Sequence, residues 1–207
     1  MTTENDVTRV VLASGNPGKI RELTALLGPA GIEILPQSQW AVPECDETGL
    51  TFVENAILKA RNASQHTGLP AIADDSGIEV DALHGRPGIY SARYSGPDAD
   101  DRSNNTKLLA RMERVSDELR TARFRCVMAF LTHAEDPSPI LAEGSWEGLI
   151  ARAPAGSGGF GYDAVFYLPE YGCSAAELPA EVKNRISHRA QAVQAMVGRL
   201  IRRLGRH

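Results

Sequence analysis

Two adjacent carboxylates, Asp74 and Asp75, follow a short apolar run at residues 71–73 and precede Ser76 and Gly77. Leu69-Pro70 before this stretch and Gly77 after it bound a strand so short that we expect it to be buried, with the two acids at its mouth. Neighbouring carboxylates repel each other and resist desolvation, so a buried pair needs a compensating group, most often a divalent cation. The alternative is a turn in which one carboxylate accepts hydrogen bonds from the following backbone amides.

A second group of residues has the composition of a phosphate-binding loop. It joins a β-branched run at residues 10–13 to a helical pattern, and its sequence at residues 14–19 is Ser-Gly-Asn-Pro-Gly-Lys. Glycines let backbone amides approach an anion, the following helix directs its positive end toward it, and Lys19 adds a charge. The spacing differs from a Walker A loop, because Ile20 stands where Ser or Thr would hold magnesium. A plain strand-to-helix turn is the alternative.

Another acidic cluster, at residues 44–47, precedes the helix with the clearest start signal. Thr51 and Glu54 have the spacing of a capping box, and the apolar pattern predicts a helix over residues 51–63. Acidic runs are most often solvated loops. Magnesium in nucleotide sites, however, takes one or two protein carboxylates together with phosphate oxygens and waters. The cluster is therefore a candidate second contribution to a metal site at the first acidic pair.

A glycine-rich segment at residues 158–163 carries two aromatic rings, Phe160 and Tyr162, and ends in Asp163. Glycines leave room for a flat ligand, and the rings could stack on a nucleotide base. The alternative is a loop whose aromatic side chains fill the core.

Basic side chains gather near the start of the last predicted helix, at Lys183, His188 and Arg189. The lysine and the arginine could neutralise phosphate oxygens, and the Ser187–Arg189 run could donate hydrogen bonds to a base. The alternative is a helix capped by Ser187 with solvated basic neighbours.

Length, charge and cysteine content limit the class of protein. A chain of 207 residues fits one domain, or one domain with a subsidiary lobe. Its net charge of −4 argues against a general nucleic-acid binder, and no apolar run approaches the length of a membrane span. Three widely spaced cysteines indicate reduced thiols and a cytoplasmic protein. Strand–helix units followed by an antiparallel run predict an α/β protein with a mixed sheet.

Taken together and in order, these motifs resemble those of the inosine/xanthosine triphosphate pyrophosphatases. The resemblance runs from about residue 9 to about residue 204. It is carried by Ser-Gly-Asn-x-x-Lys at 14–19, Glu-Thr-Gly-x-Thr-Phe-x-x-Asn-Ala at 47–56, Ala-Asp-Asp-Ser-Gly at 73–77, Pro-Gly-x-x-Ser-Ala-Arg-Tyr at 87–94, Gly-Gly-Phe-Gly-Tyr-Asp at 158–163 and Ser-His-Arg at 187–189.

The resemblance implies an elongated mixed β-sheet with flanking helices, in which two lobes surround a central nucleotide-binding cleft. It implies a single domain over residues 1–207, for which we expect a flexible tail at residues 1–8. A homodimer and dependence on Mg²⁺ are also implied. The implied reaction is hydrolysis of dITP, ITP and XTP to the monophosphate and pyrophosphate, which keeps deaminated purines out of DNA and RNA.

Individual residues take their roles from the same resemblance. Asp75 corresponds to the general base and to one metal ligand. Asp46 corresponds to the second metal carboxylate, with Glu47 as the alternative, because this chain has Asp where the bacterial pattern usually has Glu. The implied substrate-binding residues are Ser14, Gly15, Asn16, Pro17, Gly18, Lys19, Ser76, Phe160, Gly161, Tyr162, Asp163, Lys183, His188 and Arg189.

Two other functions are compatible with the sequence: a pyrophosphatase for other modified nucleotides, and a non-catalytic nucleotide-binding regulator. A regulator would not need the acidic cluster at residues 44–47. An aspartyl phosphatase is less compatible, because its chemistry uses an Asp-x-Asp pair and the acids here are adjacent. In each case the expected partner is a small nucleotide, with no nucleic acid or membrane.

Overall fold

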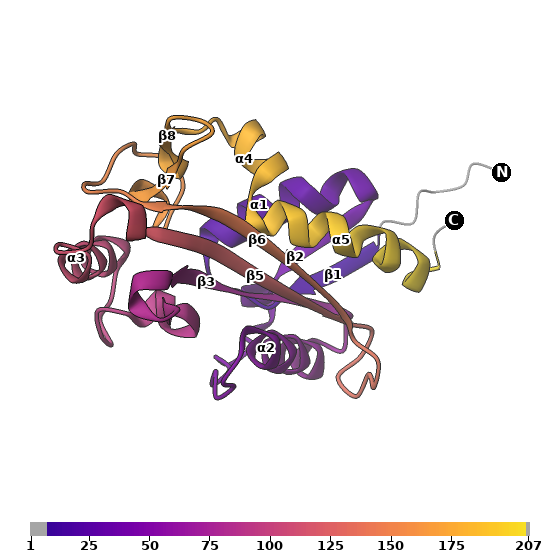
Figure 1. Ribbon diagram of the computed structural model, residues 1–207. Helices are drawn as coiled ribbons and strands as arrows, with labels where there is room; N and C mark the ends of the chain where they lie inside the picture. The colour runs from indigo at the N-terminus through magenta and orange to yellow at the C-terminus, as the bar shows by residue number, and fades with distance from the viewer. Residues whose placement is uncertain (1–7, 206–207) are drawn as a thin grey trace. The chain divides into compact units, whose positions relative to one another are not determined.

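Over the described residues, 8–205, the computed structural model contains eight strands and five α-helices (Figure 1). The strands are β1 (Thr8–Leu12), β2 (Ile32–Pro36), β3 (Ala71–Val80), β4 (Arg86–Pro87), β5 (Thr121–Leu131), β6 (Ile140–Ile150), β7 (Phe166–Leu168) and β8 (Cys173–Ser174). The helices are α1 (Pro17–Leu27), α2 (Phe52–Thr67), α3 (Asp101–Arg111), α4 (Ala180–Ile186) and α5 (His188–Arg203). No helix in this part of the chain is long and apolar enough to cross a membrane.

The strands form one sheet in the order β2-β1-β3-β5-β6-β7-β8, with β4 paired to β3. β1 pairs in parallel with β2 and β3, whereas the β3–β4, β6–β7 and β7–β8 pairs are antiparallel. The sheet is therefore mixed, which confirms the α/β class predicted from the order of strands and helices.

The chain divides into two compact units. Unit 1 comprises the residues up to Asp75, residues 127–144 and those from Arg189 onward, and unit 2 comprises residues 76–126 and 145–188. β3, β5 and β6 each contribute to both units. The two units correspond in number to the expected lobes, while the cleft between lobes and the elongated shape stay predictions. The tail expected at residues 1–8 lies outside the described residues, apart from Thr8, which begins β1.

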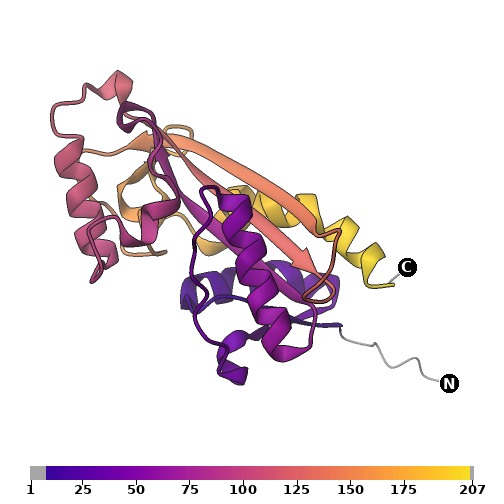
Figure 2. The ribbon, with the colours of Figure 1, turned by 90° about the horizontal axis from the view of Figure 1, so that it is seen from below.

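In unit 1, α2 covers one face of the strands, and α1 and α5 lie on the other (Figures 1 and 2). Thr51 caps α2 as predicted, because its hydroxyl accepts the Glu54 amide hydrogen bond while the Glu54 carboxylate accepts that of Leu50. Small side chains on the buried face of α2 allow it to approach the sheet closely. That core cluster contains Ala56, Ala60, Ala63, Val11, Ala13, Ala71, Ala73, Val127, Ala129 and Leu131.

β3 corrects the prediction for the acidic pair. The sequence predicts a short strand bounded by Gly77 with the acids at its mouth, or a turn at the acids, but β3 is ten residues long and runs through both acids and Gly77 to Val80. Repulsion and desolvation do not end the strand, because each carboxylate meets cations on its own side of the backbone.

Unit 2 has a separate core in which the aromatic side chains of Phe124, Trp146 and Phe166 pack together. The helices at the C-terminal end of the chain also differ from the prediction of one last helix that begins near Lys183. Lys183 does not lie at the start of the last helix but on the separate helix α4, which ends at Ser187 in an extended conformation (ψ 160°). α5 then begins at His188.

Candidate active site

Asp74 and Asp75 direct their carboxylates to opposite faces of β3, since successive side chains alternate along a strand. Ala71 and Ala73 belong to the core under α2, and Asp75 shares their face. Asp74 lies on the other face and contacts residues of α1 and α5. The two adjacent acids therefore have different partners.

Asp74 is the centre of a buried ionic network. Its Oδ2 lies 3.1 Å from Lys19 Nζ and accepts hydrogen bonds from Arg189 Nη2 at 3.0 Å and Nε at 3.3 Å. Arg189 Nη1 donates in addition to the Glu22 carboxylate. Burial acts to raise the pKa of Asp74, but Lys19 and Arg189 hold that pKa far below its usual range. Asp74 is thus a permanently charged anchor for two cations.

Asp75 is held by two side chains of α2. Lys59 Nζ lies 2.6 Å from Asp75 Oδ1, and Asn55 Nδ2 lies 3.4 Å from Oδ2. Burial raises the pKa of the Asp75 carboxyl above its usual value, while Lys59 acts to lower it. Burial acts against the charge of Lys59, but the carboxylates of Asp75, Asp74 and Glu47 raise its pKa. A buried carboxylate with a raised pKa is a stronger base than a solvated one and is suited to accept a proton.

The acidic loop before α2 approaches this site through Glu47. Glu47 Oε1 accepts a hydrogen bond from the same Lys59 Nζ at 2.9 Å, whereas Asp46 is exposed. Gly49 fixes the loop to α2, because its amide donates to Asn55 Oδ1 at 2.9 Å. A Cβ on Gly49 would lie 2.7 Å from that oxygen, so a larger residue would displace the loop. The contact favours Glu47, the alternative choice, as the second carboxylate beside Asp75.

The donor set on this face fits Mg²⁺, which prefers carboxylate oxygens and keeps phosphate and water ligands. Among residues 8–205, no group of three His, Cys, Asp or Glu side chains is arranged to hold a metal ion. A Mg²⁺ ion at Asp75 would therefore take its remaining ligands from a nucleotide phosphate and from water.

The predicted phosphate loop forms the N-terminal cap of α1. Asn16 Oδ1 accepts hydrogen bonds from the amides of Gly18 at 2.8 Å and Lys19 at 3.2 Å. Residues 15–17 are exposed and Ser14 is half-buried. The loop is thus held in one conformation by Asn16, and its lysine side chain extends to Asp74.

The predicted base segment forms a second cluster, in unit 2. Asp163 Oδ2 accepts hydrogen bonds from the Phe160 amide at 2.8 Å and from Lys183 Nζ at 2.6 Å. Lys183 Nζ also lies 5.1 Å from the centre of the Phe160 ring. A Cβ on Gly159 would come within 2.0 Å of Asp163 Oδ2, so glycine is required there. Asp163 therefore organises the segment around Phe160 and Lys183.

Tyr162 differs from Phe160 in this segment. Phe160 is half-buried, but Tyr162 is only 4% exposed, and its hydroxyl donates to the Ser91 carbonyl at 2.8 Å. Burial raises the pKa of the Tyr162 hydroxyl. Tyr162 thus fills the core, the alternative we considered for this segment, and Phe160 is the ring that a base could contact.

His188 is held by aromatic stacking in unit 2. Its imidazole lies 4.7 Å from the Phe124 ring at an interplanar angle of 10°, and 6.3 Å from the Trp146 ring at 19°. The neighbouring residue, Arg189, belongs to unit 1, so the predicted His-Arg pair is divided between the units, as are Asp75 and the half-buried Ser76.

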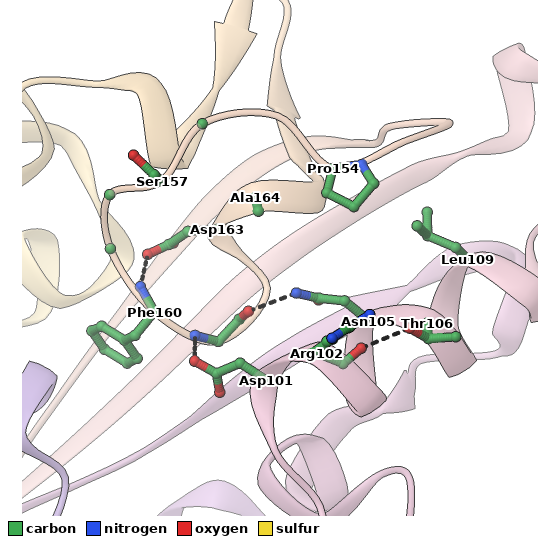
Figure 3. Close-up of a pocket in the computed structure, with 14 residues that line it drawn as sticks. Asp101, Arg102, Asn105, Thr106, Leu109, Pro154, Ser157, Phe160, Asp163 and Ala164 are labelled. Carbon is green, nitrogen blue, oxygen red and sulfur yellow. Dashed lines mark hydrogen bonds between the residues drawn. The ribbon is translucent and has the colours of Figure 1, made fainter.

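A pocket of about 410 Å³ lies beside the base segment in unit 2 (Figure 3). One wall is the glycine-rich loop, with Phe160, Gly161 and Asp163, and the other is α3. Gly161 is hydrogen-bonded to Asp101 and Asn105 of that helix.

Lys59 is the main site residue that the sequence reasoning missed. Its partners lie 12 and 16 residues away in sequence, so the contact exists only after α2 has packed on β3. One signal was available: Asn55 and Lys59 are four residues apart on a helix whose cap is predicted from the sequence, and so share a face. Glu22, which binds Arg189, carried no such signal.

A mixed α/β fold with a carboxylate–lysine site and an aromatic base segment is the architecture expected for a nucleotide-binding enzyme. The family model described as the Ham1 family matches residues 10–199, and the chain belongs to this family.

The relatives and solved structures agree with this assignment. A dITP/XTP pyrophosphatase of Thioalkalivibrio sulfidiphilus is 63% identical over 192 residues, which cover 93% of this chain and 98% of the relative. One from Escherichia coli K12 is 57% identical with the same coverage. The structure of a HAM1 protein from Coxiella burnetii has a TM-score of 0.86 and 47% identity, and covers 94% of this chain and 99% of that one.

Proposed function

We propose that this protein hydrolyses dITP, ITP and XTP to the nucleoside monophosphate and pyrophosphate, and so removes deaminated purine nucleotides before they enter DNA or RNA. The observation that carries the proposal is the 63% identity, over nearly the whole of both chains, with a protein named dITP/XTP pyrophosphatase. The Asp75 site supports the same reaction, because it combines a buried carboxylate with a cation and a second acid.

In this reaction Asp75 accepts a proton from the water that attacks the α-phosphorus. The water oxygen forms a bond to that phosphorus, the bond to the bridging oxygen of the β-phosphate breaks, and pyrophosphate leaves. Lys59 and Asn55 hold the Asp75 carboxylate in one orientation. Lys19, at the start of α1, contacts the triphosphate. Asp75 together with Glu47 or Asp46 would hold Mg²⁺, which would supply positive charge that stabilises the leaving pyrophosphate.

Selectivity against adenine nucleotides rests on position 6 of the purine, whereas guanine shares the keto oxygen there and differs at position 2. Hypoxanthine and xanthine carry a keto oxygen there, which accepts hydrogen bonds, while adenine carries an amino group, which donates them. A donor such as His188, held by Phe124 and Trp146, would pair with the keto oxygen and face another donor in ATP. A mismatch of buried polar groups of this kind can discriminate by several orders of magnitude.

The proposal includes a cytoplasmic homodimer. Three free cysteines, of which Cys126 is buried, are compatible with a reducing compartment. The dimer is implied by the resemblance alone, and sedimentation equilibrium of the purified protein tests it.

The reaction is tested by hydrolysis of dITP with Mg²⁺ in water enriched in ¹⁸O. We expect pyrophosphate as the product and the label in dIMP, because water attacks the α-phosphorus. Orthophosphate as the first product would indicate a phosphatase. Tight binding of dITP with no turnover would indicate a regulator. Either result would reject the proposal.

A further inference from the structure

Both backbone polar groups of one residue in the base segment, Gly161, are hydrogen-bonded to α3. Its partners, Asp101 and Asn105, are labelled in Figure 3. The Gly161 amide donates to Asp101 Oδ2 at 2.6 Å, and the Gly161 carbonyl accepts from Asn105 Nδ2 at 3.0 Å. Asp101 and Asn105 are four residues apart and so lie on the same side of the helix. Gly161 has a φ of 64°, a conformation that side-chain-bearing residues rarely adopt. The loop between Phe160 and Tyr162 is therefore fixed from outside itself.

α3 is a rigid support for these contacts. Its first turn is closed by a capping box in which Asp100 and Ser103 satisfy each other's backbone amides. Asn104, beside Asn105, accepts from the Ser95 amide at 2.7 Å and donates to the Ala92 carbonyl at 3.0 Å. The helix thus has its own attachment to unit 2, and does not depend on the base segment for its position.

The environment of Asn105 suggests more than a packing role. The residue is 9% exposed, and its Oδ1 has no hydrogen-bond partner within residues 8–205. A buried amide oxygen without a partner lowers stability. An apolar residue of similar size would avoid that cost but would lose the hydrogen bond to Gly161. The loss of stability caused by the unpartnered Asn105 Oδ1 is explained if the hydrogen bond from Asn105 to Gly161 is needed for substrate binding.

We infer that Asp101 and Asn105 are positioning residues that hold Gly161, and with it the Phe160 ring, in the geometry that selects the purine base. The inference rests on the proposed function. Neither residue acts on the phosphates or on Asp75, so their loss affects binding and selection of the base and leaves the bond-breaking step nearly unchanged.

The test compares Asp101→Ala and Asn105→Ala with two controls. Asp101→Asn keeps an oxygen that can accept from the Gly161 amide. Thr106→Ala changes another residue lining the same pocket, whose hydroxyl donates only within α3, to the Arg102 carbonyl. Steady-state kinetics with dITP and dGTP, thermal melting, and hydrogen exchange of the Gly161–Tyr162 amides are measured for each variant.

We expect each alanine variant at positions 101 and 105 to raise KM for dITP about five- to tenfold, the equivalent of one lost hydrogen bond, with kcat within about twofold. The preference for dITP over dGTP should narrow, the loop amides should exchange faster, and both controls should behave as wild type. Unchanged exchange, or a loss of kcat that follows a lowered Tm, would overturn the inference. A wild-type protein that does not hydrolyse dITP would reject the proposed function instead, and the exchange measurement would still decide whether α3 fixes the loop.

Discussion

Asp74 and Asp75 are consecutive residues of β3, yet their carboxylates bind lysines from different helices. Asp74 Oδ2 lies 3.1 Å from Lys19 of α1, and Asp75 Oδ1 lies 2.6 Å from Lys59 of α2. The alternation of side chains along a strand separates a permanently charged anchor from a carboxylate whose pKa is raised by burial. We therefore expect substitution of Asp75 to affect turnover and substitution of Asp74 to affect stability.

Asp75→Asn should abolish turnover with little effect on stability. Removing a general base costs about 10²- to 10⁴-fold in rate, while Lys59 keeps the Glu47 carboxylate as a counter-charge. We expect kcat for dITP to fall at least about 100-fold, and Tm to stay within a few degrees. Kinetics and thermal melting of the same preparation check this, and near-normal turnover would contradict the assignment of Asp75.

Asp74→Asn should instead destabilise the fold. The substitution leaves Lys19 and Arg189 without their common counter-charge, and breaking a buried ion pair costs about 3–5 kcal/mol. For a chain of this size that corresponds to a Tm lowered by about 10 °C. Glu33→Gln is a suitable control, because Glu33 is in an exposed pair with Arg9. A Tm equal to wild type would show that Asp74 is not the anchor.

The proposed Mg²⁺ site, and the choice between Glu47 and Asp46 as its second carboxylate, can be tested by titrating activity with Mg²⁺. Glu47 shares Lys59 with Asp75, whereas Asp46 is exposed. We expect Glu47→Gln to raise the Mg²⁺ concentration for half-maximal activity by at least tenfold, and Asp46→Asn to change it by less than about threefold. A larger increase in the Mg²⁺ requirement for Asp46→Asn than for Glu47→Gln would instead identify Asp46, the residue that the resemblance favours, as the second carboxylate. Activity of the wild type in excess EDTA would reject the metal altogether.

Gly159 should tolerate no side chain, because a Cβ there would meet Asp163 Oδ2 at 2.0 Å. Gly159→Ala should displace Asp163 from Phe160 and Lys183 and raise KM for dITP. Gly172→Ala is a matched control, because Gly172 has a similar positive φ, 67° against 74°, and open space at its Cβ. The control should lose about 1 kcal/mol of stability and keep its KM. Equal KM values for the two variants would contradict the role of Asp163.

Asp136 should make stability depend on pH. Its carboxylate is buried, which acts to raise its pKa, but hydrogen bonds from the Thr132 amide and hydroxyl and from the Ser138 amide lower that pKa from 3.8 to about 2. As pH falls, Asp136 becomes protonated in the unfolded chain before it does so in the folded protein. The stabilisation that its charged carboxylate gives the fold is therefore present above pH 3.8 and is lost as pH falls to 2. The difference corresponds to about 2 kcal/mol.

Urea denaturation of Asp136→Asn should therefore give an unfolding free energy about 2 kcal/mol below that of wild type at pH 7, and a smaller deficit at pH 3. Glu135→Gln, an exposed neighbour on the same connection, should show no such pattern. A deficit that is constant with pH would mean that the carboxylate charge is not responsible.

Local signals in the sequence were sufficient for part of this structure. Thr51 and Glu54 predicted the start of α2 because a helix cap depends only on neighbouring residues. The end of β3 was predicted wrongly at Gly77, because glycine is only a local turn signal and the cations that stabilise Asp74 and Asp75 come from helices far away in sequence. α4 was missed for a local reason: its N-cap, Pro179, makes no side-chain hydrogen bond.

In the candidate site, too, residues in local motifs could be predicted from the sequence, and residues that act through distant contacts could not. Asp75 and Phe160 could be proposed as site residues from the sequence, because both lie in motifs that the resemblance covers. Lys59 and Asp101 could not, because their importance lies in contacts with β3 and with Gly161 that form only on folding.

The most direct test of the central claim is the rate of pyrophosphate release from a panel of purine nucleotides at equal concentration with Mg²⁺, for the wild type and Asp75→Asn. We expect the wild type to hydrolyse dITP, ITP and XTP at least about 100-fold faster than dATP and dGTP. We expect Asp75→Asn to hydrolyse none of the three substrates at a rate comparable with that of the wild type. Equal rates with dATP or dGTP, or no pyrophosphate from dITP, would contradict the central claim.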